Sequence, residues 1–153
     1  MNRRDLLGLL GASAAGFTAL AAYGSGPAGE TDHNHGGPFD QCAKACSDCL
    51  RECESCAAHC ARLVASGKKD HLTTWQTCAD CAEFCAAAAR IASRHGPLAV
   101  TICEACAKAC DACGAACEKT PDDKHMQECA KACRDCAKAC RDMVKQVGHA
   151  QSK

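Results

Sequence analysis

Small apolar side chains, chiefly cysteine, recur along residues 39–148 at alternating steps of three and four, while charged residues fill the positions between them. Within the four cysteine groups the steps are 4, 3, 4, 3, 4, then 3, 4, then 3, 4, 3, 4, and then 4, 3, 4. A mean step of 3.5 residues is typical of the inward-facing seam of a helix in a left-handed bundle. The pattern therefore predicts four helices with cysteine at the a and d positions. The groups contain Cys42, Cys46, Cys49, Cys53, Cys56 and Cys60; Cys78, Cys81 and Cys85; Cys103, Cys106, Cys110, Cys113 and Cys117; and Cys129, Cys133, Cys136 and Cys140.

Short polar segments separate the groups and set the expected helix ends. Residues 66–70 follow the first group. Gly96 and Pro97 follow the second, with glycine as a stop and proline as a first helical residue. Thr120 and Pro121 precede the fourth group as an N-cap and a first helical residue. The expected helices lie near residues 39–66, 70–95, 97–119 and 121–148. Their short connections predict an all-α fold, an up-down-up-down antiparallel four-helix bundle with cysteines lining the core.

The predicted core contains little branched apolar volume. Residues 39–148 contain 12 Leu, Ile, Val and Phe, against 24 Ala and 18 Cys. Alanine promotes helix formation but buries little surface, and reduced cysteine is a small hydrophobe. We therefore expect a column of thiols that either leaves space along the bundle axis or is completed by something bound there.

Charge and aromatic content exclude some classes of function. The chain has 18 Lys and Arg against 18 Asp and Glu, and only 3% aromatic residues. A nucleic-acid-binding protein needs a basic face, which a balanced chain does not indicate. No Ser/His/Asp arrangement stands apart from the cysteine ladder, and no C-x-x-C pair is singled out as a redox enzyme would require. The sequence therefore predicts a protein that is not an enzyme and binds no nucleic acid.

The first 29 residues contain no cysteine and differ from the rest in composition. Arg3 and Arg4 precede an apolar run at residues 6–22, and Ala19 and Ala21 offer a small-x-small cleavage site. This arrangement resembles a twin-arginine export signal. An uncleaved membrane anchor and an ordinary secretory signal are the alternatives.

Four segments are therefore expected along the chain. They are a twin-arginine-type signal peptide at residues 1–22, a flexible Gly/Pro/His linker at 23–38, the cysteine-lined bundle at 39–148 and a tail at 149–153. We expect export to the periplasm with no membrane attachment after signal removal, or a cytoplasmic protein if the signal does not function.

Three kinds of chemistry compete for so many thiols. Disulfides suit an exported protein with an even number of cysteines, but neighbours three or four apart on one helix lie awkwardly for an S–S torsion of about 90°. Zinc and iron–sulfur sites need four converging ligands, usually from turns or loops, and an uninterrupted ladder singles out no such set. A disulfide-stapled or zinc-binding helical structural protein is therefore kept as the alternative.

The third kind of chemistry is the binding of many Cu(I) ions. Thiolate is the soft ligand that selects Cu(I), and neighbours on one helix or on two helices supply the two or three sulfurs that each ion accepts. Uncompensated buried thiolates would repel one another strongly, whereas monovalent ions neutralise them one for one. Zinc in four-sulfur sites would leave a double negative charge at each site. We therefore expect Cu(I) at about one ion per cysteine.

The cysteine runs from Cys49 to Cys53, Cys103 to Cys117 and Cys129 to Cys140, behind the twin-arginine-like leader, resemble the bacterial copper storage proteins. These are four-helix bundles with cysteines lining the core, and the resemblance covers residues 39–148. It implies Cu(I) storage by inward-pointing thiolates, assembly as a homotetramer and metal uptake through one end of the bundle. Copper buffering, detoxification or supply to a copper-requiring enzyme or chaperone is the expected role.

One end of the predicted bundle carries weaker copper ligands. The first and third connections share this end, and His59, His125 and Met126 lie near them. Imidazole and thioether bind Cu(I) less strongly than thiolate, which suits capture and transfer, and the family's uptake end lies here too. We expect these three residues to capture copper, with solvation of the histidines and simple packing of Met126 as the alternatives. The second seam, continued backwards from Cys78, reaches Trp75 at the same end.

Overall fold

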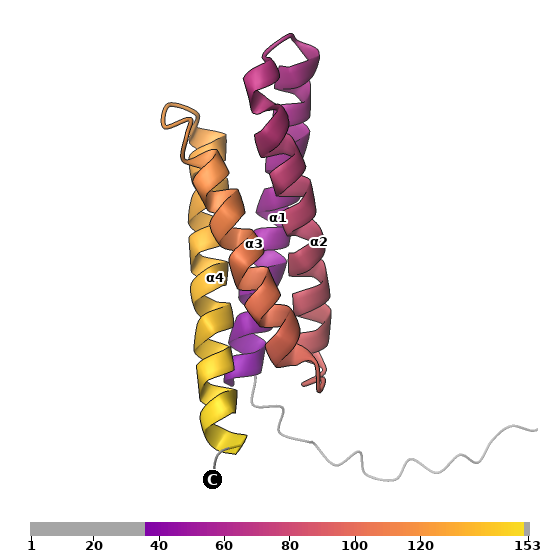
Figure 1. Ribbon diagram of the computed structural model, residues 1–153, viewed down its shortest axis with the longest axis vertical. Helices are drawn as coiled ribbons and strands as arrows, with labels where there is room; N and C mark the ends of the chain where they lie inside the picture. The colour runs from indigo at the N-terminus through magenta and orange to yellow at the C-terminus, as the bar shows by residue number, and fades with distance from the viewer. Residues whose placement is uncertain (1–35, 152–153) are drawn as a thin grey trace, which may run out of the picture. The chain divides into compact units, whose positions relative to one another are not determined.

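Four long helices form the part of the chain that the structure describes, residues 36–151 of a computed structural model, with side chains described to residue 148 (Figure 1). They are α1 (Pro38–Ala65), α2 (Leu72–Ser93), α3 (Ala99–Cys117) and α4 (Lys124–Gln151), and the short 3-10 helix η1 (Lys69–His71) precedes α2. Helices α1 and α3 each pack against both α2 and α4. Successive helices are therefore antiparallel neighbours, and the predicted up-down-up-down bundle is confirmed.

The two ends of the bundle carry different connections. The end that is uppermost in Figure 1 holds the α1–α2 and α3–α4 connections, and we call it the upper end. The lower end holds the α2–α3 connection, the start of α1 and the end of α4. Side chains near the first and third connections therefore share the upper end, as the sequence predicted.

Helices α1 and α2 both end at a residue in the left-handed region. Gly67 follows α1 with a φ of 93°, and His95 follows α2 with a φ of 50°. The left-handed residue and its successor donate backbone hydrogen bonds into the last turn, at 2.9 and 3.0 Å in α1 and at 2.8 and 3.1 Å in α2. This is the Schellman arrangement. The sequence favoured Gly96 as the stop of α2, but His95 takes the left-handed position and Gly96 only follows it.

Helix α4 begins at Lys124, three residues later than the sequence predicted. Its cap is Asp123 rather than Thr120, because Asp123 Oδ1 accepts the amides of the second and third helical residues at 3.0 and 3.2 Å. Pro121 lies in a turn instead of opening the helix. Proline has a fixed φ and no N–H, and a turn accommodates both as well as the first turn of a helix does.

The other boundaries differ from the expected ones by a few residues. Helix α3 begins at Ala99 rather than at Pro97, α1 begins at Pro38, and α4 extends to Gln151. The predicted leader and most of the predicted linker lie outside the described residues. Among the helices of residues 36–151, none is both long and apolar enough to cross a membrane.

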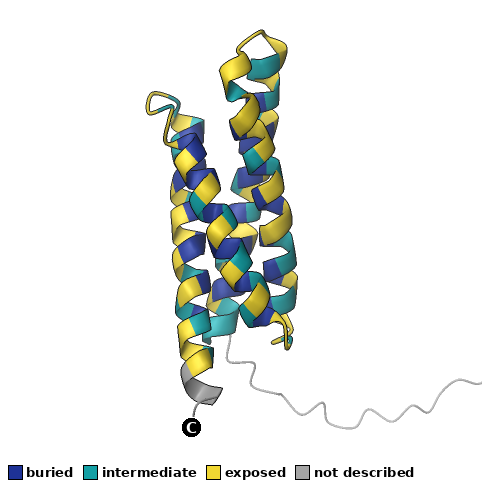
Figure 2. Cartoon of the chain, in the orientation of Figure 1, coloured by how far each residue is buried: buried dark blue, intermediate teal, exposed yellow. Residues whose placement is uncertain are grey.

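The buried side of each helix is a stripe of cysteine and alanine (Figure 2). All eighteen cysteines are buried, each at most 1% exposed. The largest fully buried side chains are Met126 and Met143. Charged residues lie outside, in exposed pairs such as Lys131 and Asp135, whose Nζ and Oδ2 are 2.6 Å apart and which add little to stability. Thiols rather than branched aliphatic side chains therefore fill the axis of this bundle.

Candidate metal centre

The core residues lie in layers across the bundle axis. A step of seven residues returns to the same side of each helix, and the buried positions of all four helices repeat in register on this step. Each layer takes one residue from every helix, except the uppermost, which lies beyond the end of α3. From the lower to the upper end, layers 1 to 6 contain Cys42, Ala92, Cys103 and Met143; Cys46, Ala88, Cys106 and Cys140; Cys49, Cys85, Cys110 and Cys136; Cys53, Cys81, Cys113 and Cys133; Cys56, Cys78, Cys117 and Cys129; and Cys60, Thr74 and Met126. Layers 3, 4 and 5 therefore contain cysteine from all four helices.

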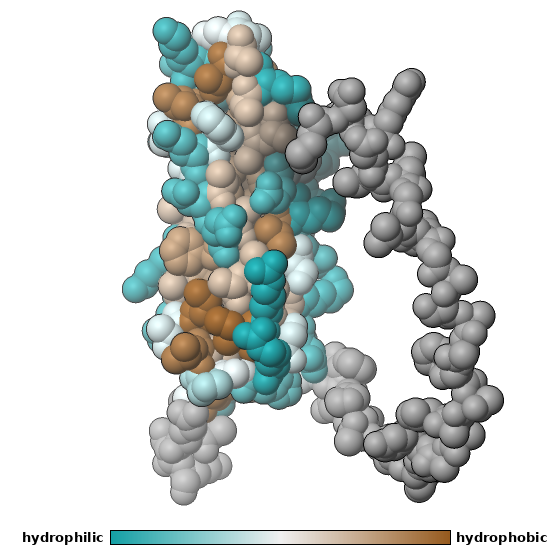
Figure 3. Space-filling model, turned by 90° about the vertical axis from the view of Figure 1, so that its right-hand side faces the viewer, coloured by the Kyte–Doolittle hydropathy of each residue, from teal (hydrophilic) through white to brown (hydrophobic). Residues whose placement is uncertain are grey.

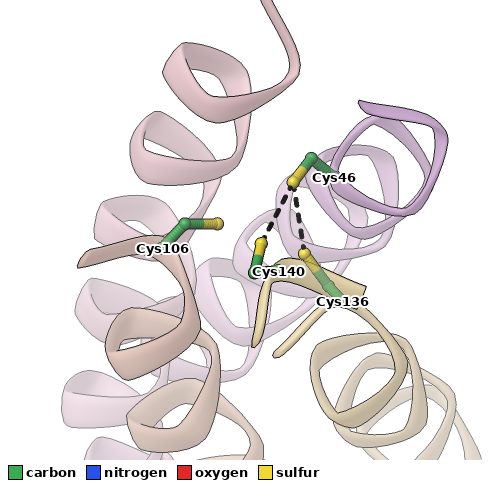
Figure 4. Close-up of side chains that lie close together, drawn as sticks. All are labelled: Cys46, Cys106, Cys136 and Cys140. Carbon is green, nitrogen blue, oxygen red and sulfur yellow. Dashed lines mark hydrogen bonds between the residues drawn. The ribbon is translucent and has the colours of Figure 1, made fainter. Parts of the chain in front are cut away.

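Sulfur atoms are in contact both within layers and between them. Within layer 1 the Sγ atoms of Cys42 and Cys103 are 3.5 Å apart. Figure 4 shows how layers 2 and 3 join: the sulfur of Cys46 lies 3.6 Å from that of Cys140 in its own layer and 3.6 Å from that of Cys136 in the next. Cys106 of α3 points into the same space. The thiols thus form a nearly continuous column along the axis rather than separate pockets.

None of the eighteen cysteines forms a disulfide. The closest sulfur pairs are 3.5 Å apart, against about 2.05 Å for an S–S bond. The structure therefore contains none of the bridges that the disulfide-stapled alternative requires among these cysteines. The core is a set of free donor atoms.

The buried thiols change one another's acidity. A hydrogen bond with Cys113 is the largest of the effects that lower the pKa of Cys117 to about 5. A hydrogen bond with the same Cys113 raises the pKa of Cys53, and burial raises the pKa of Cys60. Some sulfurs thus accept S–H hydrogen bonds as thiolates while their neighbours keep the proton. Full ionisation of the column therefore requires cations to offset the repulsion between buried charges.

The donor atoms and their spacing fit a soft metal. Among residues 36–148, Thr74 is the only buried polar side chain, so the column offers sulfur without carboxylate or imidazole. With metal–sulfur bonds of about 2.3 Å, three sulfurs around one ion lie about 4.0 Å apart and two opposite sulfurs about 4.6 Å apart. The observed contacts of 3.5 to 4.0 Å need to open by only about 1 Å.

Several sulfurs belong to more than one candidate set of ligands. Sets of four cysteine sulfurs lie within 4.8 Å of one another at successive heights. Five cysteines each belong to two of these sets: Cys49, Cys53, Cys129, Cys133 and Cys136. A sulfur that serves two sets can bridge two ions. Bridging thiolates and low coordination numbers suit Cu(I) better than isolated four-ligand sites.

The structure brings the three predicted capture residues together at the upper end. The rings of His59 and His125 stack with centroids 4.9 Å apart, and Met126 is fully buried in layer 6. His59 Nε2 lies 2.8 Å from Asp123 Oδ2, and His125 Nε2 lies 3.2 Å from Ser55 Oγ. Within residues 36–151 neither Nδ1 atom has a hydrogen bond, so each ring retains one nitrogen for a metal.

Asp123 is the residue of this end that the sequence did not single out. Partial burial opposes its ionisation, but the hydrogen bond from His59 and the amides of Met126 and His125 hold the pKa of Asp123 below its usual range. Its charge in turn contributes to the raised pKa of Cys60. The pairing of Asp123 with His59 depends on the fold and has no signal in the sequence.

Trp75 does not continue the seam of α2. It is 38% exposed, and Thr74, at 7%, faces the core in its place. Thr74 precedes Cys78 by four residues, which continues the alternation of steps of four and three along α2. The expected step of three residues, back to Trp75, is therefore wrong. The upper end is therefore lined by His59, His125, Met126 and Asp123.

The lower end is apolar. Phe39, Ile91, Ile102 and Val144 are half-buried against the core, and Met143 is 1% exposed. Phe39 stacks on His95 with ring centroids 4.5 Å apart. An ion approaching from this end would meet hydrocarbon before it meets a thiol.

Residues 36–145 match a family model described as copper storage protein. Among solved structures, the chain is similar to a Cu(I)-bound copper storage protein, BsCsp3, at 36% identity and a TM-score of 0.65; the match covers 71% of this chain and 99% of that one. The apo form of copper storage protein 3 from Bacillus subtilis is 37% identical, with a TM-score of 0.59 and coverage of 69% and 97%.

A copper storage protein from Streptomyces lividans, solved with 10 copper equivalents, is also similar. It is 32% identical, with a TM-score of 0.62 and coverage of 71% of this chain and 84% of that chain. Among curated proteins, no relative of this chain is found. The similarity covers the bundle, which is the part that holds the thiol column.

Proposed function

The chain belongs to the copper storage protein family, and from this membership we propose that its core thiols bind and store many Cu(I) ions, at about one ion per cysteine. The stored copper is buffered, kept from harmful reactions or supplied to a copper-requiring enzyme or chaperone. Storage is a binding role rather than catalysis.

The observation that carries this proposal is the shared, fully buried sulfur column. Eighteen thiols converge on one axis with contacts of 3.5 to 4.0 Å, and single sulfurs serve two neighbouring sets. Each Cu(I) that binds replaces a proton, so a load of about one ion per thiol leaves the column electrically neutral. One divalent ion bound to four thiolates leaves two negative charges, so a divalent metal does not achieve this balance.

Copper capture is proposed for the upper end. His59 and His125 offer one unused ring nitrogen each, and the buried thioether of Met126 lies in layer 6 with Cys60. The carboxylate of Asp123 adds a negative charge that attracts a cation. An ion passes from these weaker ligands to Cys60 and then into the complete layers.

A homotetramer is the proposed assembly. Figure 3 views the side of the bundle where α2 lies, and apolar patches appear near both ends of this face. Helix α2 exposes Leu72, Trp75 and Phe84 at 41%, 38% and 41%. Large exposed apolar side chains on one helix are typical of a surface that another protein covers.

We place the protein in the periplasm, exported through its twin-arginine-like leader.

Graded loss of capacity tests the storage proposal. Cys46→Ser should lower the bound Cu(I) by about one ion, because sulfurs share the ions along the column. The double variant that adds Cys53→Ser should lower it by about two ions. Native mass spectrometry of the loaded full chain counts the ions. Ser47→Ala, on the exposed side of α1, is the matched control and should change nothing. A single substitution that removes most of the copper would contradict storage and indicate a small discrete site.

A further inference from the structure

Two of the complete layers have the same geometry. In layers 3 and 5 alike, the α3 sulfur lies 3.9 Å from the α1 sulfur and 3.7 Å from the α2 sulfur. In each layer all four sulfurs lie within 4.8 Å of one another, and each of the four helices contributes one. The repetition has a simple cause: every residue of layer 3 is seven positions from its counterpart in layer 5. The two layers are Cys49, Cys85, Cys110 and Cys136, and Cys56, Cys78, Cys117 and Cys129.

In each layer, two of the six sulfur–sulfur distances are close to those of a tetrahedral metal site. Four ligands around one ion with metal–sulfur bonds of about 2.3 Å lie about 3.8 Å apart. The contacts of 3.7 and 3.9 Å in both layers bracket this value. We propose that, in the copper-free protein, layers 3 and 5 are tetrathiolate sites for a divalent d10 cation of the zinc and cadmium class, one ion in each layer. This proposal departs, at these two layers, from the expectation that the ladder singles out no four ligands.

The other layers are less suited to such a site. Three further four-sulfur sets each combine two layers and share Cys49, Cys129 or Cys136 with layer 3 or layer 5, so they cannot be filled beside those two layers. Layers 1, 2 and 6 have fewer than four cysteines. Layer 4 has four, but it lies about 5 Å from each neighbour along the axis, while layers 3 and 5 are about 10 Å apart. Each filled site carries two negative charges, so filling layer 4 as well would place three dianions at about 5 Å spacing. Two occupied layers therefore avoid a repulsion that three would incur.

Layer 4 has a role as a donor layer between the two sites. A thiol of this layer that holds its proton can donate an S–H hydrogen bond to a metal-bound thiolate on either side. The contacts for this exist: Cys53 lies 3.8 Å from Cys49 of layer 3, and Cys113 lies 3.5 Å from Cys78 of layer 5. Hydrogen bonds to a metal-bound sulfur offset part of its charge.

The binding step is an exchange of cations. One divalent ion displaces four protons from four thiols, four metal–sulfur bonds form, and no electron is transferred. Cu(I) can displace the divalent ions because it neutralises every thiolate. The proposal does not rest on copper storage, since it concerns the reduced, copper-free chain.

Cobalt(II) tests the proposal because its tetrathiolate complexes absorb strongly in the visible. The reduced, metal-free full chain is titrated anaerobically with Co(II), and the tetrathiolate absorption should rise linearly to two equivalents per chain. Zn(II) should then remove the colour, one ion for one ion. An end point other than two, or cobalt spectra without four sulfur ligands, would overturn the assignment.

Three matched variants of α3 localise the sites. Cys110→Ser in layer 3 and Cys117→Ser in layer 5 should each leave one equivalent, and the two together should leave none. Cys103→Ser, the same change in the incomplete layer 1, should leave both. Equal loss in the Cys103 variant would contradict the assignment to layers 3 and 5.

Two measurements keep this test decisive. If circular dichroism shows that a variant does not fold, X-ray absorption of the wild-type Co(II) form still tests the proposal. The proposal requires four sulfur neighbours for each ion. Cu(I) capacity is measured on the same preparation. Full copper capacity without cobalt binding would reject this inference alone, whereas lost copper capacity would count against the storage function.

Discussion

Asp123 performs two structural tasks with its two oxygens. Oδ1 caps α4 by accepting two backbone amides, and Oδ2 holds His59 of α1. The cap satisfies donors that the helix itself leaves open, and the second contact joins α1 to the start of α4. One side chain thus fixes the geometry of the proposed capture site and the length of α4.

Replacement of Asp123 should separate the two tasks. Asp123→Ala should lower the free energy of unfolding by about 1 kcal/mol, the usual cost of a lost N-cap. Asp123→Asn should cost less, because asparagine caps equally well and loses only the charge. Urea unfolding of the metal-free protein, followed by circular dichroism, measures both. Equal losses in the two variants would show that the charge rather than the cap matters.

The same residue predicts a pH dependence of stability. Because the pKa of Asp123 is lower in the folded protein than its ordinary value, its contribution is complete above that ordinary value, about 3.9. The contribution is lost as the pH falls below it through the folded value. The difference in unfolding free energy between wild type and Asp123→Asn should therefore shrink on acidification below about pH 4. A difference that grows on acidification would contradict this assignment.

The two histidines of the upper end should control the rate of loading rather than the capacity. With His59→Ala and His125→Ala combined, transfer of Cu(I) from a soluble chelate should slow several-fold, because the upper end loses both imidazole ligands. The capacity should not change, because the column keeps all of its thiols. Stopped-flow absorption measures the rate, and the final copper content should stay unchanged. His95→Ala at the lower end is the control. Equal slowing in that control would count against uptake at the upper end.

Helix α2 contributes fewer thiols than the other helices, and this leaves layer 2 incomplete. Its seam continues from Cys85 to Ala88 and Ala92, both fully buried. Layer 2 thereby has cysteine on three helices and alanine on the fourth. In layer 1 both α2 and α4 lack a cysteine, because Ala92 and Met143 occupy their positions.

A thiol added at Ala88 should complete layer 2. Ala88→Cys should raise the Cu(I) capacity by about one ion, because the new sulfur lies in register with Cys46, Cys106 and Cys140. Ala87→Cys, the next position on α2 and half-buried outside the layers, is the matched control and should add no tightly bound ion. Native mass spectrometry compares them. No gain, or the same gain in the control, would contradict the layer assignment.

The sequence predicted the helices and the inward thiols, because a step of 3.5 residues leaves few alternatives for a buried stripe. The ends of the helices were less predictable. Pro121 and Gly96 are compatible with both a helix end and a turn, and the choice depends on Asp123 and His95, whose roles arise only when the helices pack. The wrong step to Trp75 has the same origin, since three and four residues both return to one side of a helix.

The cysteine spacing predicts which residues share a side of one helix, but the layers across the bundle are defined only by the fold. Heptad positions within one helix follow from the sequence, whereas the register between helices is set by the connections and their caps. The pairing of Cys110 with Cys49 and Cys85 at 3.9 and 3.7 Å is a consequence of that register. Relations between helices, such as the His59–Asp123 pair, are therefore what sequence reasoning did not supply.

The bundle as a whole uses its core for donor atoms rather than for bulky hydrocarbon. Small alanines allow the helices to approach, and the thiols fill the remaining axis. Outside this core, residues 39–148 carry balanced charges, with 15 of each sign. The molecule therefore concentrates one kind of chemistry, soft anionic sulfur, in its interior.

An anaerobic Cu(I) titration of the reduced full chain against a competing chelator tests copper storage by the thiol column most directly. A thiol count under denaturing, non-reducing conditions first establishes that all eighteen cysteines are free. The column predicts tight binding that continues to about eighteen Cu(I) per chain, because each thiol proton is replaced by one ion. Saturation at only a few equivalents with all thiols free would contradict storage by the column.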